Sequence, residues 1–304
     1  MKTNRQLIDM FLQEKLLSAA PKTYLYYKEN LQRFYDYSNR HYFSIQGGQD
    51  PEEIPYAELP KELYMEYLLS LKNSGIKNTS LATYHRAVRT FCNWMHDNAL
   101  IEKPFTDVKL PRSDAAPIVP LTAAEVRKLD EIIARTEYTD RNYLIFHFML
   151  DCGLRRQEVI SLRWEDVHIG ETDYLCIKYS KYNKSRMVPV PVFLAERLSC
   201  LPHNSGYVLK TAGKEKLTVS SVKDFFRKLK KHSGIGRLHP HLLRHTFATS
   251  FISGGGNMEY LRLYLGHADY AITQQYLHIS FQSQICGMDI YKLDKIFFKN
   301  YNNT

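Results

Sequence analysis

A proline-containing segment, residues 109–120, constrains the fold of this 304-residue chain more than any other feature. It holds three prolines and few large apolar residues. Each proline disfavours helical backbone at the residue before it, so the segment is expected to run extended as a linker. At roughly 150 residues per domain, the chain is long enough for two domains with cores of their own. We therefore predict one domain over residues 1–112, a linker over residues 113–120 and a second domain over residues 121–304.

The first domain has the sequence pattern of helices. After Pro21, apolar residues recur at intervals of three and four, which is the spacing of an amphipathic helix. A second helix is predicted over residues 60–72. A third is predicted from the point where Asn78 or Thr79 can cap the exposed amides of a first turn. The pattern predicts a small all-helical domain.

The second domain begins with a capping-box signature. Glu125 follows Thr122 by three residues, and this pair predicts a helix that runs through about residue 134. Residues 142–151 are apolar on nearly every side, which is typical of a buried helix. Gly153 can adopt the left-handed turn that ends it. A helical core is therefore expected at the start of this domain.

A change from helical to strand periodicity marks the middle of the second domain. Apolar and polar residues alternate within residues 166–192, and turn residues at 180–185 interrupt the alternation, which predicts a β-hairpin. Helices are predicted to resume over residues 221–231, 241–253, 258–265 and 269–277. The expected fold class is mainly α with a small antiparallel β-sheet, with an all-helical first domain and a mixed α/β second domain.

Basic residues are concentrated in the second part of the chain. Residues 117–304 carry +8 of the formal net charge of +9. Such an excess makes a polyanion such as nucleic acid the first partner to consider, although a solvated helical face gives the same pattern. The candidate DNA contacts are Lys184, Arg186, Lys223, Arg227, Lys228, Lys230 and Lys231.

Neither the amino terminus nor the cysteines indicate a membrane or secreted protein. Residues 1–17 include Asp9 and Glu14, and the chain has no run of about 18 uncharged apolar residues. The five cysteines are scattered, odd in number and contain no Cys-x-x-Cys pair, which favours reduced thiols in a cytoplasmic protein. No membrane partner is expected.

Four segments concentrate reactive polar residues. Arg155 follows the predicted buried helix, and residues 180–186 place three cations on the hairpin turn. His241 and Arg244 lie one turn apart and so on the same face of a helix. A Leu-Gly-His segment, residues 265–267, is followed nine residues later by a tyrosine.

Together, these side chains are suited to bind a phosphate group. Arginine's planar fork can grip two oxygens and neutralise the charge that grows in a pentavalent transition state, so such a site needs no metal. Tyr276 supplies a hydroxyl nucleophile, Lys181 supplies a cation that can protonate a leaving alkoxide, and the histidines have a pKa near neutral. Each residue alone is more often structural, and it is the ordered combination that is specific.

In this order, Gly-Leu-Arg, a hairpin lysine, His-x-x-Arg-His, Leu-Gly-His and a tyrosine resemble the signature of tyrosine recombinases, the phage-integrase and Xer family, over about residues 120–280. The resemblance implies that Arg155 is the first catalytic arginine and that Glu158 supports the site. It implies further catalytic roles for Lys181, His241, Arg244, His267 and Tyr276, with Lys184 as the alternative hairpin lysine. It also implies that the first half is a helical, SAM-like core-binding domain.

The reaction implied by the resemblance is DNA strand exchange. Tyr276 attacks a phosphodiester to form a 3′-phosphotyrosyl bond, and Lys181 protonates the 5′-oxygen that leaves. Because the covalent bond keeps the energy of the ester, religation needs no ATP, metal or other cofactor. The implied partners are double-stranded DNA with specific recombination sites and a homotetramer on synapsed DNA, with a second recombinase as an alternative partner. The tail at residues 285–300 would dock on a neighbouring subunit or pack on its own domain.

Three other classes of protein share part of this pattern. A helix-turn-helix regulator binds DNA through basic helices but has no use for Tyr276 in this order. A type IB topoisomerase shares the tyrosine and arginine chemistry, and differs in relaxing supercoils without joining two duplexes. A metallohydrolase is suggested by His241 and His245, four residues apart on a helix, although no glutamate follows His241.

Overall fold

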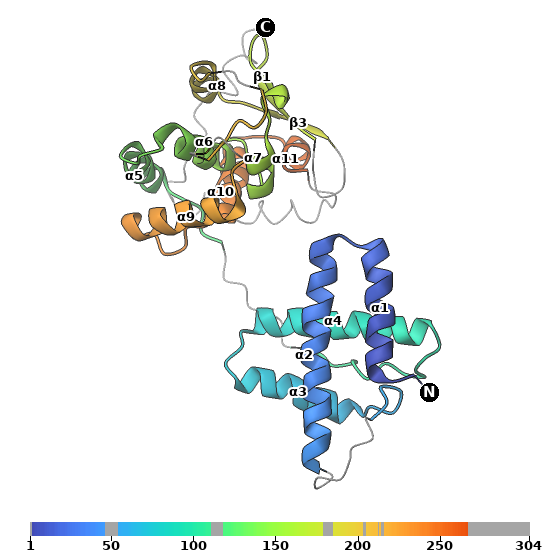
Figure 1. Ribbon diagram of the computed structural model, residues 1–304. Coiled ribbons are helices and arrows are strands. Elements are labelled where there is room, and N and C mark those ends of the chain that lie inside the picture. Colours follow the sequence, from blue (N-terminus) through green and yellow to red (C-terminus); the bar gives the residue numbers. More distant parts are fainter. Residues whose placement is uncertain are drawn as a thin grey trace. The chain divides into compact units, whose positions relative to one another are not determined.

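The structure is a computed structural model of the 304-residue chain (Figure 1). It describes residues 2–45, 54–110, 118–178, 185–202, 205–211, 213 and 216–266. The chain divides into two compact units, Met1–Ala115 and Ala116–Thr304. The division falls inside the segment predicted as a linker, residues 113–120, and each unit has a hydrophobic core of its own.

The described part of the first unit is built from helices α1 Asn4–Ser18, α2 Pro21–Ile45, α3 Lys61–Asn73 and α4 Asn78–Asp97 (Figure 1). Their contacting faces bury an aromatic core, in which Phe34 stacks against Tyr56 and packs edge-on against Tyr64. Helices α1 and α3 both contact other helices of the unit through these faces. The all-helical prediction for this part of the chain is confirmed.

Two helix starts in the first unit differ from the predictions. No helix is predicted for residues 4–18, yet Thr3 caps α1 and forms a capping box with Gln6. The predicted cap at Asn78 or Thr79 is wrong, because Lys77 occupies the N-cap position of α4 and makes no side-chain cap hydrogen bond. Asn78 is already helical, so its side chain is one position too late to cap.

The described part of the second unit combines helices with a small sheet. The helices are α5 Ala123–Ala134, α6 Thr139–Leu150, α7 Arg156–Ser161, α8 Val192–Ser199, α9 Val219–Ser233, α10 Pro240–Ser253 and α11 Met258–Leu265. A 3₁₀ turn, η1 Trp164–Asp166, leads into three antiparallel strands in the order β1 Val167–His168, β2 Tyr174–Ile177 and β3 Arg186–Pro189. Strands β2 and β3 confirm the predicted pair, whereas β1, α7 and α8 are additions to the prediction.

Helix α6 is the centre of the second core. It contacts α5, α7 and α10, and its apolar residues are buried on nearly every side, as predicted. The capping box of α5 is also confirmed: the Glu125 backbone N–H donates to Thr122 Oγ1 at 3.2 Å, and the Thr122 N–H donates to Glu125 Oε2 at 3.0 Å. Gly153 has a φ of +62°, the left-handed turn predicted after α6. This turn directs the chain into α7 and positions Arg155.

The carboxyl-terminal predictions lie outside the described residues. These are the helix over residues 269–277 and the tail at residues 285–300. Among the helices that the structure describes, none is long and apolar enough to cross a membrane.

Candidate active site

The structure describes part of the predicted catalytic set. Arg155, Glu158, His241 and Arg244 lie within the described residues, and the structure brings them to one region of the second unit. The other predicted residues lie outside the described part of the chain: Lys181, Lys184, His267 and Tyr276. The geometry of the site is therefore built from its arginines, histidines and buried glutamate.

Arg155 is held at the N-terminus of α7. It occupies the N-cap position with extended backbone (φ −74°, ψ 149°), and its N–H donates to Glu158 Oε2 at 2.7 Å. Its guanidinium donates from Nη1 to Glu158 Oε1 at 3.0 Å and from Nη2 to the carbonyl oxygen of Gly266 at 3.3 Å. The side chain is 27% exposed, so a ligand can reach the anchored guanidinium from solvent.

Glu158 is a buried carboxylate that links two arginines. Its side chain is 3% exposed and contacts Arg155 and Arg186. Burial by itself raises the pKa of this carboxyl, but the hydrogen bonds and charge of Arg186, the Arg155 N–H and the charge of Arg244 outweigh it, so the pKa lies below its usual value. Glu158 is therefore ionised at neutral pH and holds its cations in a fixed orientation.

Arg186, one of the predicted DNA contacts, is buried in the structure. The side chain is 8% exposed. Its guanidinium donates to both carboxylate oxygens of Glu158, at 2.9 Å and 2.7 Å, and from Nε to the carbonyl oxygen of Tyr264 at 2.6 Å. The physical reason is that Glu158 would be costly to bury without a cation, and Arg186 lies at the start of β3 where it reaches this carboxylate.

Arg244 reaches the same region from α10. Arg244, taken as a whole residue, is 6% exposed. Nη1 donates to the carbonyl oxygen of Gly153 at 2.5 Å, and Nη2 donates to the carbonyl oxygen of Leu265 at 2.6 Å. Gly153 lies two residues before Arg155. The bond from Arg244 to Gly153 therefore joins the His-x-x-Arg motif on α10 to the Gly-Leu-Arg segment.

Three successive carbonyl oxygens at the C-terminal end of α11 accept hydrogen bonds from three arginines. Tyr264 accepts from Arg186, Leu265 accepts from Arg244, and Gly266 accepts from Arg155. The last carbonyls of a helix have no partner within the helix and carry its partial negative charge, so cations are favoured there. Sequence patterns gave no signal of this cluster, because its acceptors are main-chain atoms.

Two histidines of α10 lie beside the arginines. Burial lowers the pKa of His241, and the nearby charges of His239, Arg244, Arg156 and Arg155 lower it further. Burial likewise lowers the pKa of His245 to about 4, with help from His241 and Arg244. Both imidazoles are therefore neutral at neutral pH. His239 caps α10, since its Nδ1 accepts from the Leu242 N–H at 2.8 Å.

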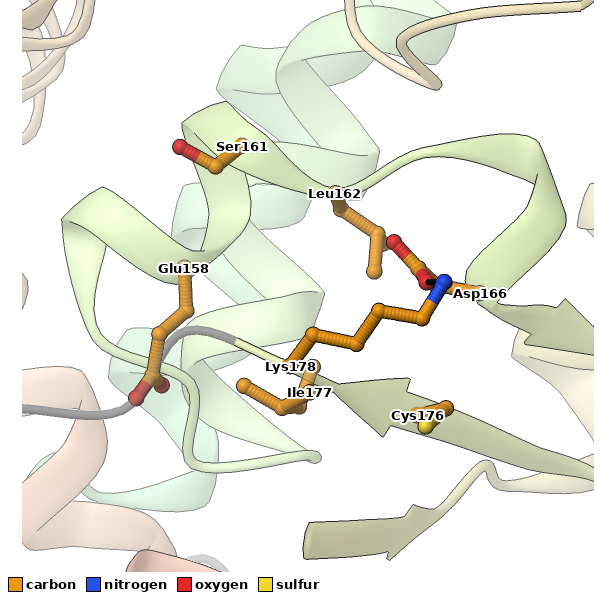
Figure 2. A pocket seen from close by; sticks show the side chains of 7 residues that line it. All are labelled: Glu158, Ser161, Leu162, Asp166, Cys176, Ile177 and Lys178. Carbon is orange, nitrogen blue, oxygen red and sulfur yellow. Dashed lines mark ion pairs between the residues drawn. The ribbon is translucent and has the colours of Figure 1, made fainter. Parts of the chain in front are cut away.

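A shallow pocket beside Glu158 shows how Lys178, the residue that follows β2, is held (Figure 2). Lys178 Nζ lies 2.6 Å from Asp166 Oδ1 and 3.4 Å from Glu165 Oε1. In Figure 2 the Lys178 side chain extends to Asp166, and the Glu158 carboxylate points away from this pair. Lys178 thus pairs with two carboxylates of η1. Among the described residues, no group of three or more His, Cys, Asp or Glu side chains is arranged to hold a metal ion.

Helix α9 presents a basic face. Its apolar residues Val222, Phe225, Phe226 and Leu229 are buried, and it contacts α5 and α7. The candidate DNA contacts on its other side are all exposed: Lys223, Arg227, Lys228, Lys230 and Lys231. Asp224 pairs with Arg227 at 2.9 Å, so the excess positive charge of this face rests mainly on the lysines.

Solved structures identify the class of fold. The chain superposes on the Tn1549 transposon integrase, determined in complex with a circular intermediate DNA, with a TM-score of 0.72 at 16% identity over 95% of this chain and 100% of that chain. It superposes on a lambda integrase dimer bound to a COC′ core site with a TM-score of 0.72 at 17% identity over 90% and 95%. The fold is that of integrases.

Sequence relatives identify the family. Residues 120–283 match the Phage integrase family. The chain is 30% identical over 261 residues to tyrosine recombinase XerA of Thermococcus onnurineus, covering 83% of this chain and 85% of that protein. It is 28% identical over 299 residues to tyrosine recombinase XerC of Bacillus pumilus, covering 91% and 93%.

The chain belongs to the phage integrase family and is a tyrosine-type site-specific DNA recombinase. The predicted family, fold class and class of reaction are thereby confirmed. The comparisons give no support to the topoisomerase, regulator and metallohydrolase alternatives.

Proposed function

We propose that this recombinase cuts DNA through Tyr276, with Arg155 and Arg244 binding the nonbridging oxygens of the scissile phosphate. The observation that carries the proposal is that Arg155 and Arg244 are anchored to adjacent carbonyls, those of Gly266 and Leu265. The next residue along the chain is His267, and Tyr276 follows nine residues later. The two guanidinium groups therefore lie at the start of the segment that carries the proposed nucleophile.

The proposed cleavage forms one phosphorus–oxygen bond and breaks another. The Tyr276 oxygen attacks the phosphorus, the bond to the 5′-oxygen breaks, and the product is a 3′-phosphotyrosyl link with a free 5′-hydroxyl. Arg155, Arg244 and His267 stabilise the charge on the nonbridging oxygens. In the second step the 5′-hydroxyl of another strand attacks the phosphotyrosyl link and releases Tyr276. The number of ester bonds is unchanged, so the exchange needs no ATP.

Two groups move protons in this proposal. Lys181 donates a proton to the leaving 5′-oxygen, with Lys184 as the alternative donor from the same turn. His241 serves as an acid/base helper or hydrogen-bond donor, and its lowered pKa leaves it neutral at neutral pH. The charge at the phosphate is met by guanidinium groups, so this route uses no metal or other cofactor.

We further propose that the basic face of α9 contacts the DNA backbone. Exposed lysines and arginines supply a mostly sequence-independent, salt-sensitive affinity for phosphates. The first unit would form the other half of a clamp around double-stranded DNA that carries a specific recombination site. The Tn1549 and lambda integrase structures are DNA complexes, which supports this partner. A DNA substrate also agrees with action in the cytoplasm.

The proposed assembly is a homotetramer on two synapsed duplexes. Exchange between two duplexes requires four strand cuts, and one tyrosine per protomer makes each cut. The tail at residues 285–300 is the candidate for linking neighbouring protomers, and a second recombinase in place of two protomers is the alternative.

A covalent-capture experiment tests the proposed function. Nicked fragments of genomic DNA from the source organism are incubated with the protein in EDTA, and DNA that stays attached after denaturation is sequenced. We expect an adduct at a defined sequence and none with Tyr276→Phe. Adducts that persist in Tyr276→Phe would contradict the assignment of the nucleophile, and adducts that require added metal ions would contradict the proposed route.

A further inference from the structure

We propose that Arg186 is a positioning residue for the recombination reaction, which holds Arg155 and Arg244 in place through Glu158 and the end of α11. The inference rests on the proposed function of the two arginines. Arg186 makes three hydrogen bonds to two different elements: its fork spans the Glu158 carboxylate, and its Nε donates to the Tyr264 carbonyl. These bonds join β3 to α7 and to α11.

The link from Arg186 to Arg155 runs through one carboxylate. Glu158 Oε1 accepts from the guanidinium groups of both arginines, at 3.0 Å from Arg155 and 2.9 Å from Arg186. Glu158 Oε2 accepts from the Arg155 main-chain N–H and from Arg186, at 2.7 Å in each case. The bidentate grip of Arg186 fixes the plane of the carboxylate, and that plane sets the direction of the Arg155 side chain.

The link from Arg186 to Arg244 runs through the last turn of α11. Arg186 binds the Tyr264 carbonyl at 2.6 Å, and Arg244 binds the next carbonyl, that of Leu265, at the same distance. Gly266 packs directly on Arg186, since a Cβ added there would lie 3.1 Å from the Arg186 Cδ. Arg186 therefore fixes the helix end to which both phosphate-binding arginines are anchored.

Its hydrogen bonds separate the role of Arg186 from that of a DNA contact. Its Nε, Nη1 and Nη2 all donate to acceptors within the protein, and its side chain is 8% exposed, against 76% for Arg227 on the basic face of α9. A group held in this way acts on the geometry of the arginines and leaves the DNA-binding surface unchanged. Misplacement of a reacting or charge-binding group by about 1 Å costs on the order of 100-fold in rate. The expected effect of losing Arg186 is thus on the rate of cleavage at saturating DNA.

The test measures single-turnover cleavage and DNA affinity on the nicked duplex recovered by covalent capture. Arg186→Gln is expected to lower the rate at saturating DNA by about 100-fold and to leave the dissociation constant for DNA near that of the unaltered protein. Arg186→Lys, which keeps the charge but loses the fork, is expected to retain an intermediate rate. Weaker DNA binding with an unchanged saturating rate would overturn the inference and restore Arg186 as a DNA contact.

A matched control separates positioning from loss of stability. Val188 is 1% exposed and lies two residues after Arg186 on the same strand, so Val188→Ala destabilises β3 without touching the carboxylate. We expect Val188→Ala to cleave at the unaltered rate when folded, as checked by thermal unfolding. Equal rate losses in Val188→Ala and Arg186→Gln would contradict the inference. Absence of any adduct with the unaltered protein would contradict the proposed function itself, whereas an active protein with a fully active Arg186→Gln contradicts this inference alone.

Discussion

The guanidinium of Arg244 donates a hydrogen bond to the carbonyl oxygen of Gly153, at 2.5 Å. Gly153 lies two residues before Arg155, so this bond joins α10 to the loop that leads into α7. Gly153 has a φ of +62°, and an added Cβ would lie 2.5 Å from the Phe247 ring. The main chain is therefore closely packed at the point where the two proposed phosphate-binding arginines are joined.

Gly153→Ala is expected to destabilise the second unit and to slow cleavage. Left-handed backbone and overpacking against Phe247 together should lower the free energy of unfolding by about 3 kcal/mol. Gly234→Ala is the control, because Gly234 has a φ of +72° but no atom within 4 Å of an added Cβ. That variant should lose only about 1 kcal/mol, from the backbone alone. Urea unfolding compares the two, and equal losses would show that contact with Phe247 is unimportant.

Arg155→Ala and Arg244→Ala are each expected to reduce cleavage by about 100-fold or more, because each removes a charge contact made in the transition state. DNA affinity should change little, since the basic face of α9 remains. Single-turnover cleavage and a filter-binding titration on the same duplex give the two quantities. Near-normal cleavage by either variant would show that the phosphate is held by other groups.

The basic face of α9 is expected to contribute affinity without contributing to chemistry. Lys223→Ala should weaken DNA binding and lower the slope of log affinity against log salt by about 1, as for one lost phosphate contact. Asp224→Asn on the same helix removes a negative charge, so it should have the opposite effect on DNA affinity and strengthen binding. Titrations at several salt concentrations measure both. Identical salt slopes for the unaltered protein and Lys223→Ala would mean that this face is solvated and free of DNA.

A buried charged group supports the helix that precedes the site. His147 on α6 lies with Nδ1 2.6 Å from Asp151 Oδ2 and Nε2 3.0 Å from Asp130 Oδ1. Burial alone lowers the pKa of this imidazole, but hydrogen bonds and charge from the two carboxylates outweigh burial and raise the pKa to about 9. The raised pKa means that the folded protein binds this proton more tightly than the unfolded chain does.

The contribution of His147 to stability should therefore be present at low pH and lost at high pH. It is complete below the unfolded pKa of 6.5 and disappears as the pH rises through about 9. The difference between these two values corresponds to roughly 3 kcal/mol. His147→Gln should be less stable than the unaltered protein at pH 6, and the difference in unfolding free energy should narrow as the pH rises from 6.5 through about 9. Urea unfolding over this range measures the difference, and a difference that does not change with pH would contradict the assignment.

Local signals in the sequence were sufficient where one or two neighbouring residues decide the structure. The capping box of Thr122 and Glu125 and the left-handed Gly153 depend only on nearby main-chain geometry, and both were predictable. Helix α11 was predictable with its observed bounds, because Gly266 ends it in a left-handed conformation. The cap at Asn78 was mispredicted because two successive polar residues could cap and the helix in fact starts one residue earlier.

The features that the sequence could not predict depend on hydrogen bonds between residues far apart in the chain. Arg186 looked like one more cation on a basic hairpin, and its partner Glu158 lies 28 positions earlier in the chain. The order of motifs identified Arg155 and Arg244 as a pair. The acceptors that hold them together are main-chain carbonyls, and a main-chain carbonyl leaves no trace in the pattern of side chains. Only the folded chain brings the end of α11 to these arginines.

Peptide mapping of the DNA adduct tests the central claim most directly. After covalent capture, nuclease digestion leaves a short nucleotide on the attacking residue, and mass spectrometry of the proteolysed protein locates it. The chain has 22 tyrosines, so the position is informative. We predict the nucleotide on Tyr276 and linked through a 3′-phosphate. Attachment at another residue, or through a 5′-phosphate, would contradict the proposed mechanism.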